Sequence, residues 1–331
     1  MRSFPRRASR RTLPRPAMAN ATAIPPNLPQ RGEVVDGKYL IEDVLGEGGS
    51  GIVVLANHLL LGQRVAIKFL LHHAAESGER LLREARAVSA IRSEHVTRVL
   101  DVGRLPSGAP YMVMEHLVGT DLGRLRRARL RLPISDAVDA VLQACEPIAE
   151  AHAMGIIHRD LKPANLFVVA RPDRSLSIKV LDFGLSKAAH DRGGPLTAVG
   201  VVAGTPHYMA PEQMQSLRDV DHRADLWSLG VILYYLISGR RPYGGRSLPE
   251  MWIAILRGPP PPMASVGPQV PPELEAVIMR CLERDPSRRM PSIVELSQGL
   301  APFASPRGRQ SVEYVRCASE PRGPLSQELA R

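Results

Sequence analysis

Short apolar segments separated by turns dominate the pattern from Lys38 to Glu115. Five of these segments are rich in β-branched and apolar residues and are bounded by glycine or polar turns, which is typical of strands: Tyr39–Leu45, Ile52–Asn57, Arg64–Leu70, Val96–Gly103 and Tyr111–Glu115. Between the third and fourth, Glu76–Ile91 carries apolar residues at helical spacing. This part of the chain is therefore predicted to be a small sheet with one helix.

The spacing of apolar residues changes after His116 and becomes mainly helical. The clearest helices are Ile134–Met154, Ala224–Ser238, Leu248–Leu256 and Pro272–Glu283. Between the first two of these lies a short hairpin, Leu166–Ala170 and Ser177–Leu181, with the turn RPDRS. The pattern predicts an α+β protein with two lobes, a β-rich lobe followed by a larger and mainly α-helical lobe.

Both ends of the 331-residue chain differ from its centre. Residues 1–32 are rich in Pro and Arg and have no hydrophobic periodicity. We expect a disordered basic head over 1–38, a folded domain over 39–301 with lobes of about 39–115 and 118–301, and a flexible tail over 302–331. Folded structure is expected to begin near Lys38.

The formal net charge of +10 resembles that of a nucleic-acid-binding protein until it is located along the chain. Residues 1–31 contain seven arginines and no acidic residue, and residues 302–331 contain five arginines and three glutamates. The rest of the chain is left with a charge of about +1. The basicity belongs to the two ends, so no nucleic-acid partner is expected for the folded part.

Cysteine usage and hydropathy favour a cytoplasmic protein. Cys145, Cys281 and Cys317 are far apart and odd in number, which argues against a disulfide framework or a zinc site and for a reducing compartment. The longest apolar run, Leu226–Ile237, is too short to span a bilayer and is typical of a buried helix. No apolar signal-peptide core occurs in the first thirty residues.

A glycine-rich segment, Gly46–Val53 with the sequence GEGGSGIV, follows the first predicted strand. A GxGxxG pattern alone is shared with dinucleotide-binding folds, in which a helix follows the third glycine. Here the β-branched run Ile52–Ala56 follows instead, so the segment is predicted to be the turn of a hairpin. Such a hairpin can bring its backbone amides close to phosphate groups, although an ordinary glycine-rich turn explains the pattern equally well.

Lys68 is the single charge in the apolar strand VAIK. A buried ammonium without a partner is costly, so the strand predicts a nearby anion. Glu84 is a candidate, because it lies on the same side of its predicted helix as the apolar stripe. The alternative is a surface pair between Arg80 and Glu84 at i, i+4.

The strongest local signal is HRDLKPAN over His158–Asn165, followed by Asp182-Phe183-Gly184. The hairpin between the two motifs leaves from Asn165 and returns to Asp182, so both can face one metal site. Oxygen ligands of this kind suit Mg²⁺, which keeps several waters and shares phosphate oxygens. Asp160 is then placed to accept the proton of a hydroxyl group.

These motifs resemble those of the protein kinases, and the likeness is strongest to the eukaryotic-like (Hanks-type) serine/threonine kinases of bacteria. The resemblance extends through Ala210-Pro211-Glu212, the segment Asp225–Gly230 and Arg289, and covers roughly residues 39–300. It implies the bilobal protein-kinase fold. It also implies a serine/threonine protein kinase that transfers the γ-phosphate of ATP, with Mg²⁺ or Mn²⁺ as metal ion.

The resemblance assigns a role to individual residues. Asp160 becomes the catalytic base, Lys68 pairs with Glu84, Asn165 and Asp182 bind the metal ion, and Glu212 pairs with Arg289. The glycine-rich segment would cover the phosphates, through Gly46, Glu47, Gly48, Gly49, Ser50, Gly51 and Val53. The adenine would be sandwiched by Leu45, Val53, Ala66 and Phe167. Its edge would hydrogen-bond the backbone of Glu115 to Leu117, which follows Met114 in the chain.

The acceptor side of the resemblance favours Ser and Thr over Tyr. Lys162, followed by Pro163, is typical of serine/threonine kinases, and Thr205 would contact Asp160 and Lys162. Arg159 suggests a site for an activation-segment phosphate, with Thr197 as the hypothesised autophosphorylation site. Many bacterial relatives have two threonines in that region, whereas here Ala198 and Val199 follow Thr197.

Two other functions share parts of this pattern. A pseudokinase scaffold of the same fold usually lacks the equivalent of Lys68, Asp160 or Asp182, and all three are present. A small-molecule phosphotransferase with the same core generally lacks the long segment from Asp182 to Glu212. The expected partners are therefore proteins with Ser or Thr acceptors, with self-association for autophosphorylation and without a transmembrane segment.

Overall fold

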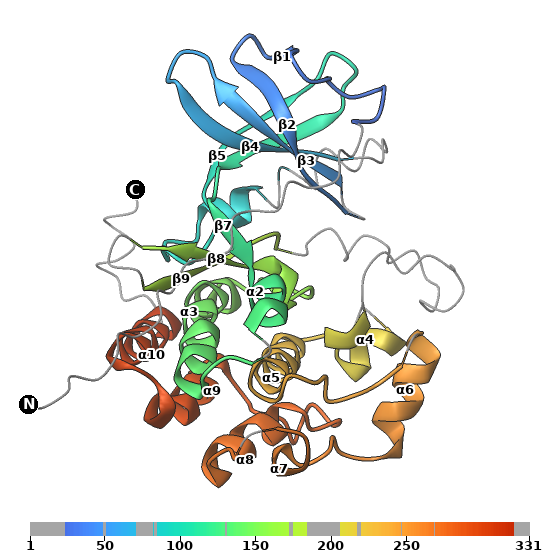
Figure 1. Cartoon of the computed structure of the whole chain (residues 1–331), viewed down its shortest axis with the longest axis vertical. Helices are drawn as coiled ribbons and strands as arrows, with labels where there is room; N and C mark the ends of the chain where they lie inside the picture. The colour runs from blue at the N-terminus through green and yellow to red at the C-terminus, as the bar shows by residue number, and fades with distance from the viewer. Residues whose placement is uncertain are drawn as a thin grey trace, which may run out of the picture.

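A computed structural model describes most of the chain, and two lobes stand one above the other in it (Figure 1). The described residues are 24–48, 51–70, 82, 85–129, 131–171, 175–183, 206–216, 220–245, 247–267 and 269–320. Of the site residues named above, Gly49, Ser50, Glu84, Thr197 and Thr205 lie outside these ranges.

The upper lobe contains a sheet with the strand order β1-β2-β3-β4-β6-β5, antiparallel throughout. Its strands are β1 (Val34–Val35), β2 (Tyr39–Gly48), β3 (Gly51–His58), β4 (Gln63–Phe69), β5 (Val99–Arg104) and β6 (Pro110–Glu115). Alternate residues of the central strands, such as Ile52 and Val54, are buried on one face. Of the predicted helix, residues 85–89 are described and helical, and Ala85 and Val88 are buried.

The lower lobe is mainly α-helical, as the spacing predicted. Its helices are α2 (Leu122–Arg129), α3 (Ile134–Ala153), α4 (Pro211–Gln215), α5 (Arg223–Ser238), α6 (Leu248–Arg257), α7 (Met263–Val266), α8 (Pro272–Cys281), α9 (Ile293–Leu300) and α10 (Pro306–Ser319). Short 3-10 turns are η1 (Pro163–Asn165), η3 (Pro206–Tyr208) and η4 (Ala301–Phe303). A small sheet of β7 (Gly119–Asp121), β8 (Leu166–Ala170) and β9 (Leu176–Val180) lies between the lobes.

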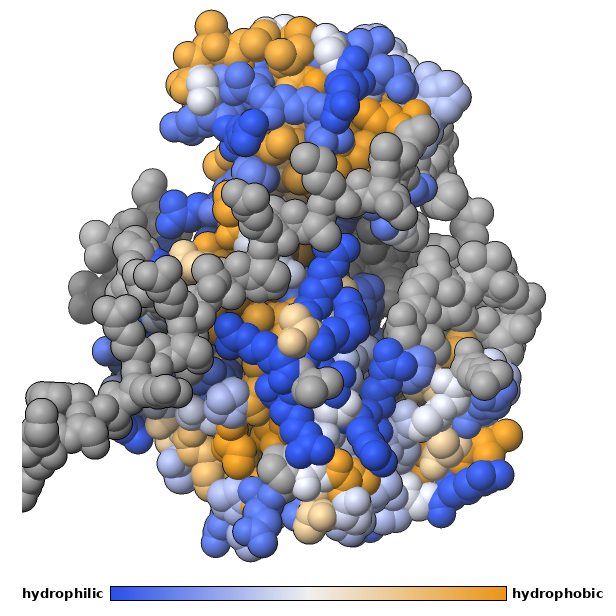
Figure 2. Space-filling view, viewed as in Figure 1, coloured by the Kyte–Doolittle hydropathy of each residue, from blue (hydrophilic) through white to orange (hydrophobic). Residues whose placement is uncertain are grey.

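Helix α5 is the centre of the lower lobe. Every residue from Ala224 to Ser238 is buried, which explains why the sequence of this helix is apolar all round. Gly239 ends the helix with a φ of 80°, a left-handed conformation in which glycine has no steric penalty. On the outside of the lobe, Figure 2 shows hydrophilic residues gathered over α2, whose sequence includes Arg124, Arg126, Arg127 and Arg129.

The structure corrects the expected ends of the folded domain. Leu28 and Val35 are 3% and 2% exposed and belong to the core of the upper lobe, so folded structure begins before Lys38. At the other end, the tail expected to be flexible forms α10 over residues 306–319. Both predictions were wrong because a few apolar residues at wide spacing are enough to dock a segment onto an existing core.

The described ranges hold no bilayer-spanning helix: none of their helices combines the necessary length with the necessary apolar character. The apolar run of α5 is accounted for by its burial inside the lower lobe.

Candidate active site

Lys68 and Asp182 connect the two lobes across the waist of the molecule. The Lys68 side chain is 3% exposed, and its Nζ lies 2.8 Å from Oδ1 of Asp182. A buried ammonium needs an anion, and the aspartate that follows β9 supplies one. The predicted partner Glu84 lies outside the described residues, so the Lys68–Glu84 pair stays a prediction.

The glycine-rich hairpin joins β2 to β3, with Gly46 opposite Val53 and Gly48 opposite Gly51. A Cβ on Gly51 would lie 2.0 Å from the carbonyl oxygen of Phe69, so only glycine lets β3 approach β4 this closely. A Cβ on Gly46 or Gly48 would meet nothing within 4 Å. These two glycines therefore leave open space beside the backbone, whereas Gly51 is required by the packing of the sheet.

Residues expected around an adenine ring come from both sides of the waist. Ala66 on β4 pairs with Met114 on β6, and Val53 pairs with Lys68. Phe167 lies opposite Asp121 in the small sheet. Leu45, in the second half of β2, is 41% exposed.

Glu115 and Leu117 form the connection from the upper lobe to the lower one. The Glu115 N–H donates to the carbonyl of Arg98 at 3.0 Å, so it is not available to a ligand. The backbone N–H of Leu117 has no partner among the described residues. The carboxylate of Glu115 accepts from the Arg98 N–H at 2.9 Å and from Lys179 Nζ at 2.8 Å. This contact of Lys179 ties the connection to β9, and no sequence motif indicates it.

Asp160, Lys162 and Asn165 form one hydrogen-bonded group on the loop before β8. Lys162 Nζ lies 2.9 Å from Oδ2 of Asp160. The amide nitrogen of Asn165 donates to the Asp160 carbonyl at 2.8 Å and to Oδ2 at 3.2 Å. The Asp160 carboxylate is 20% exposed, so it can be reached from outside while two donors fix its orientation.

Asp225 of α5 holds this loop from beneath. Its side chain is fully buried and accepts the N–H groups of His158 and Arg159, each at 2.9 Å, as well as Nε2 of His152 at 2.8 Å. Burial by itself raises the pKa of Asp225, but the hydrogen bonds from the His152 ring and from the His158 backbone outweigh burial and lower it. The surrounding bonds also hold Arg159 at a φ of 61°, a strained conformation for a residue with a Cβ.

Asn165 and Asp182 lie next to each other, as the hairpin argument predicted. The Leu181 N–H donates to the Asn165 carbonyl at 2.8 Å, and Asp182 follows at a φ of 43°. Oδ1 of Asn165 and Oδ2 of Asp182 have no partner among the described residues. Two such oxygens suit Mg²⁺, which takes few protein ligands and completes its shell with water and phosphate oxygens. In the described ranges no group of three or more His, Cys, Asp or Glu residues could hold a metal ion.

Phe183 fixes the segment that carries Asp182. Its side chain is 1% exposed, and its ring centroid lies 4.7 Å from that of His158. Nε2 of His158 lies 3.2 Å from the Leu181 carbonyl. Burial lowers the pKa of His158, more than the nearby Asp225 raises it, so the ring is neutral near pH 7.

A pocket lies beside Asp160. It is lined by Arg159, Asp160, Leu161, Lys162, Tyr208, Met209 and Ser228. Ser228 on α5 donates to the Tyr208 carbonyl at 2.7 Å, and Gln213 on α4 donates to the Arg159 carbonyl at 3.1 Å. Gln213 and Ser228 were not predicted from the sequence. They connect the wall of the pocket to the loop of Asp160.

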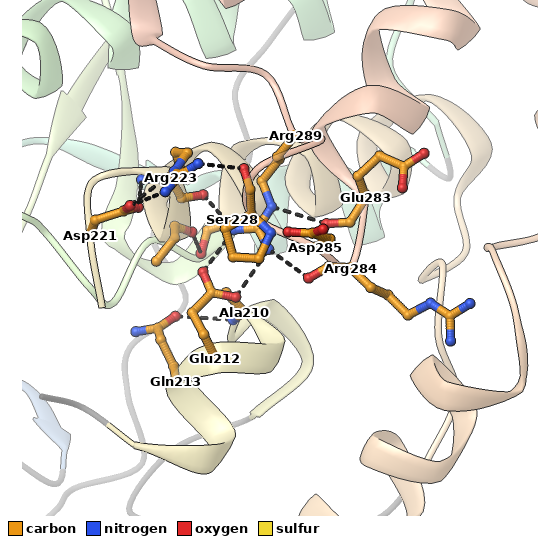
Figure 3. A network of polar contacts seen from close by, with 12 residues as sticks. Ala210, Glu212, Gln213, Asp221, Arg223, Ser228, Glu283, Arg284, Asp285 and Arg289 are labelled. Atoms are coloured by element: carbon orange, nitrogen blue, oxygen red, sulfur yellow. Dashed lines mark hydrogen bonds and ion pairs between the residues drawn. The ribbon is translucent and has the colours of Figure 1, made fainter. Parts of the chain in front are cut away.

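The expected pair of Glu212 and Arg289 is present and lies at the centre of a polar network (Figure 3). Arg289 donates to both carboxylate oxygens of Glu212, at 2.7 and 3.0 Å, and to the carbonyls of Arg223 and Glu283. Its guanidinium lies 5.2 Å from the ring of Trp227. A side chain that is 1% exposed thus has its charge and donors satisfied, and it fixes α4 against α5.

Comparisons with known proteins agree with this geometry. The protein kinase domain family matches residues 39–299. The chain is 41% identical to the serine/threonine-protein kinase Pkn1 of Myxococcus xanthus over 285 residues, which are 85% of this chain and 40% of that protein. It is 33% identical to the serine/threonine-protein kinase PknB of Mycolicibacterium smegmatis over 269 residues, 80% of this chain and 42% of that protein.

A solved structure of Rad53 residues 1–466 in complex with AMP-PNP is also similar. It has a TM-score of 0.65 and 25% identity, and the match covers 80% of this chain and 65% of that one. The chain spans less than half the length of the two bacterial relatives.

Proposed function

The chain belongs to the protein kinase domain family, and we propose that it is an active serine/threonine protein kinase that transfers the γ-phosphate of ATP to proteins. The observation that carries the proposal is the arrangement of Asp160, with Lys162 and Asn165 bonded to its carboxylate and Asp182 beside Asn165. This group brings a base, a cation and two oxygen ligands together at one reachable place.

Asp160 acts on the acceptor. The hydroxyl oxygen of Ser or Thr forms a bond to the γ-phosphorus, the bond from that phosphorus to the β,γ-bridging oxygen breaks, and the hydroxyl proton goes to the Asp160 carboxylate. Lys162 places a positive charge beside the phosphoryl group that is being transferred. In protein kinases generally, the residues of this loop position the reacting groups and stabilise the charge of the transferred phosphoryl group.

Asn165 and Asp182 would hold Mg²⁺ or Mn²⁺ through their remaining oxygens, and Lys68 would hold the α- and β-phosphates. The metal ion supplies positive charge for the triphosphate. The open space beside Gly46 and Gly48 supports an approach of phosphate oxygens to that hairpin. Leu45, Val53, Ala66, Met114, Leu117 and Phe167 are proposed to contact the adenine, with Glu47, Gly49, Ser50 and Gly51 completing the cover of the phosphates.

The finer assignments rest on the sequence. Thr205 and Lys162 are proposed to favour Ser and Thr acceptors, Glu84 to pair with Lys68, and Thr197 to be the main autophosphorylation site opposite Arg159. A cytoplasmic location and self-association during autophosphorylation complete the proposal. A pseudokinase is not favoured, because Lys68, Asp160, Asn165 and Asp182 are all present.

Asp160→Asn tests the proposal most directly. Purified chain, labelled ATP, Mg²⁺ and a generic Ser/Thr substrate should give labelled phosphoserine and phosphothreonine, and excess EDTA should abolish labelling. We expect Asp160→Asn to lower kcat by roughly 10²- to 10⁴-fold with little change in ATP affinity. Undiminished turnover in this variant would remove Asp160 from the reaction, and mass mapping after incubation with ATP would decide Thr197.

A further inference from the structure

Helix α10 lies outside the range matched by the kinase family and packs along α3 (Figure 1). Gly308, Ser311 and Val315 are buried on the side of α10 that meets this helix. A Cβ on Gly308 would lie 2.1 Å from Oδ1 of Asp139 and 2.9 Å from the Cβ of Ala304, so a larger residue would push α10 or these side chains away. The same Asp139 oxygen accepts the N–H of Ser305 at 3.0 Å, at the start of α10.

Tyr314 of α10 contacts a carboxylate that is 5% exposed. Its hydroxyl donates to Oε1 of Glu150 at 2.7 Å. The same carboxylate accepts the backbone N–H groups of Arg92 and Ser93, each at 2.8 Å. A buried carboxylate is stabilised by the number of its donors, and α10 supplies one of the three donors that Glu150 has in the described part of the chain.

Ser311 makes a second contact of the same kind, one turn earlier on α10. Its side chain hydrogen-bonds Glu146 of α3, a carboxylate that also accepts from the Ser93 hydroxyl at 3.1 Å. Nε2 of His95 lies 3.6 Å from the other Glu146 oxygen. Two carboxylates on α3 thus bond to α10 on one side and to the segment 91–97 on the other.

The segment 91–97 continues directly to the active site. Val180 donates to the His95 carbonyl at 2.7 Å, and the Thr97 N–H donates back to the Val180 carbonyl at 3.1 Å. Val180 is two residues before Asp182. Thr97 and Asp182 line one small cavity, together with Val88, Val96, Val99, Met112, Met114, Val180 and Phe183. The position of the segment 91–97 therefore constrains where Asp182 stands.

We propose that Tyr314 and Ser311 are positioning residues of the active site. Through Glu150 and Glu146 they hold the segment 91–97 in the place that sets Asp182 for the nucleotide. The link to catalysis rests on the function proposed above, but the contacts themselves are independent of it. A helix beyond the family range would thereby form part of the support of the nucleotide site.

The expected effect follows from one lost hydrogen bond. A hydrogen bond to a charged group contributes enough to shift an equilibrium roughly ten- to a hundredfold at most, and a neutral one about five- to tenfold. Because Tyr314→Phe removes a donor to a carboxylate that keeps its bonds to the Arg92 and Ser93 amides, we expect the amides of Arg92 to Thr97 to exchange hydrogen about tenfold faster, at the lower end of the range for a charged group. Ser311→Ala should act in the same direction, and the double variant more strongly.

The test compares Tyr314→Phe with Arg316→Ala in the full chain. Arg316 is on the same helix, is exposed, and has ion pairs only with Glu313 and Glu320 among the described residues. Hydrogen exchange is measured for the segment 91–97 and, as a reference for global stability, for α5. The Kd of Mg-ATP and the kcat on a generic substrate are then measured for both variants.

Faster exchange confined to the segment 91–97 in Tyr314→Phe, with weaker Mg-ATP binding and no such change in Arg316→Ala, would support the proposal. Unchanged exchange there, exchange that rises equally in α5, or a local rise without any change in Mg-ATP binding or kcat would overturn it. Exchange and nucleotide binding need no turnover. An inactive wild type would therefore refute the proposed function while these two measurements still decide the role of α10.

Discussion

The two halves of the proposed active site are held in different ways. On the acceptor side, Asp160 stands on a loop that the lower lobe holds by itself, through Asp225 and Gln213. On the nucleotide side, Lys68 belongs to one lobe and Asp182 follows a strand of the other, and an ion pair joins these two residues. The acceptor half is preorganised by the core of the lower lobe, whereas the geometry of the nucleotide half depends on the relative position of the two lobes.

This difference predicts which half is adjustable. Buried hydrogen-bonded groups with several partners have one low-energy arrangement, and a partly exposed ion pair can be exchanged for another partner at small cost. Asp182 is 36% exposed, and Asp225 is fully buried. We therefore expect the nucleotide side to respond to ligands and the acceptor loop to stay fixed.

Asp225→Ala should have the largest effect, because it breaks the preorganised half. Removing this carboxylate leaves two backbone N–H groups and His152 without their acceptor in a buried place, which costs about 3–5 kcal/mol. We expect a large loss in the free energy of unfolding, measured in urea, together with nearly complete loss of activity. Asp285→Ala is the control: this exposed carboxylate bonds Ser287 alone among the described residues, and its loss should leave both nearly unchanged.

Lys68→Met should separate activity from stability. The ammonium is buried, so an apolar side chain of similar length removes a desolvated charge and leaves the free energy of unfolding about unchanged. The loss of one electrostatic contact to the phosphates should lower kcat roughly 10²- to 10³-fold. Steady-state kinetics and urea unfolding on the same preparation measure both. A strongly destabilised variant would mean that the Lys68–Asp182 pair contributes as much to the free energy of unfolding as Asp225 does.

Arg289→Met tests the ion pair that fixes α4. Glu212 loses a bidentate charged partner but is 19% exposed and can be rehydrated, so the expected cost is about 2–3 kcal/mol. The double variant Arg289→Met with Glu212→Leu should recover part of this loss, since both charges are then gone. Equal unfolding energies for the single and double variants would show that the other donors of Arg289, and not the pair, matter.

Sequence could predict the acceptor loop because its residues are close together in the chain. Asp160, Lys162 and Asn165 are within six positions, and the hairpin that follows brings Asp182 to Asn165. The residues that hold this loop in place could not be predicted in the same way. Asp225 lies 65 positions after Asp160, and nothing in a helix that is apolar all round indicates that its one acid binds two loop amides.

The C-terminal helix could have been found from local signals. Ser305 followed by Pro306 is a typical helix start, and the Ser305 hydroxyl caps the N–H groups of Arg307 and Gly308. The hydrogen bond from Tyr314 to Glu150 could not, because these two residues are 164 positions apart in the chain. A glutamate in a helix is more often on a solvated face than in a buried network.

His158 predicts how the acceptor side responds to acid. Burial lowers its pKa below the ordinary 6.5, so the folded state keeps the ring neutral where the unfolded state binds a proton. Stability should therefore fall as the pH decreases from about 6.5 toward the lowered pKa of the folded state, by at most about 1.4 kcal/mol per pH unit for one proton. Urea unfolding at several pH values, with His158→Leu as the comparison, measures the slope. An equal slope in that variant would assign the effect to other groups.

Lys179→Met should have the smallest effect and tests the nucleotide side alone. Lys179 bonds the Glu115 carboxylate and the Val96 carbonyl, so it ties the connection between the lobes to β9. The two side chains are 16% and 27% exposed, and a pair of this kind contributes about 1 kcal/mol after screening by solvent. Because Leu117 lies only two residues after Glu115, a looser connection should raise the KM for ATP about three- to fivefold and leave kcat and the KM for the protein substrate unchanged. Lys179→Arg keeps the charge and should restore most of the ATP affinity. A fall in kcat with an unchanged KM for ATP would instead place the effect of Lys179 on Asp182, three residues further along the chain.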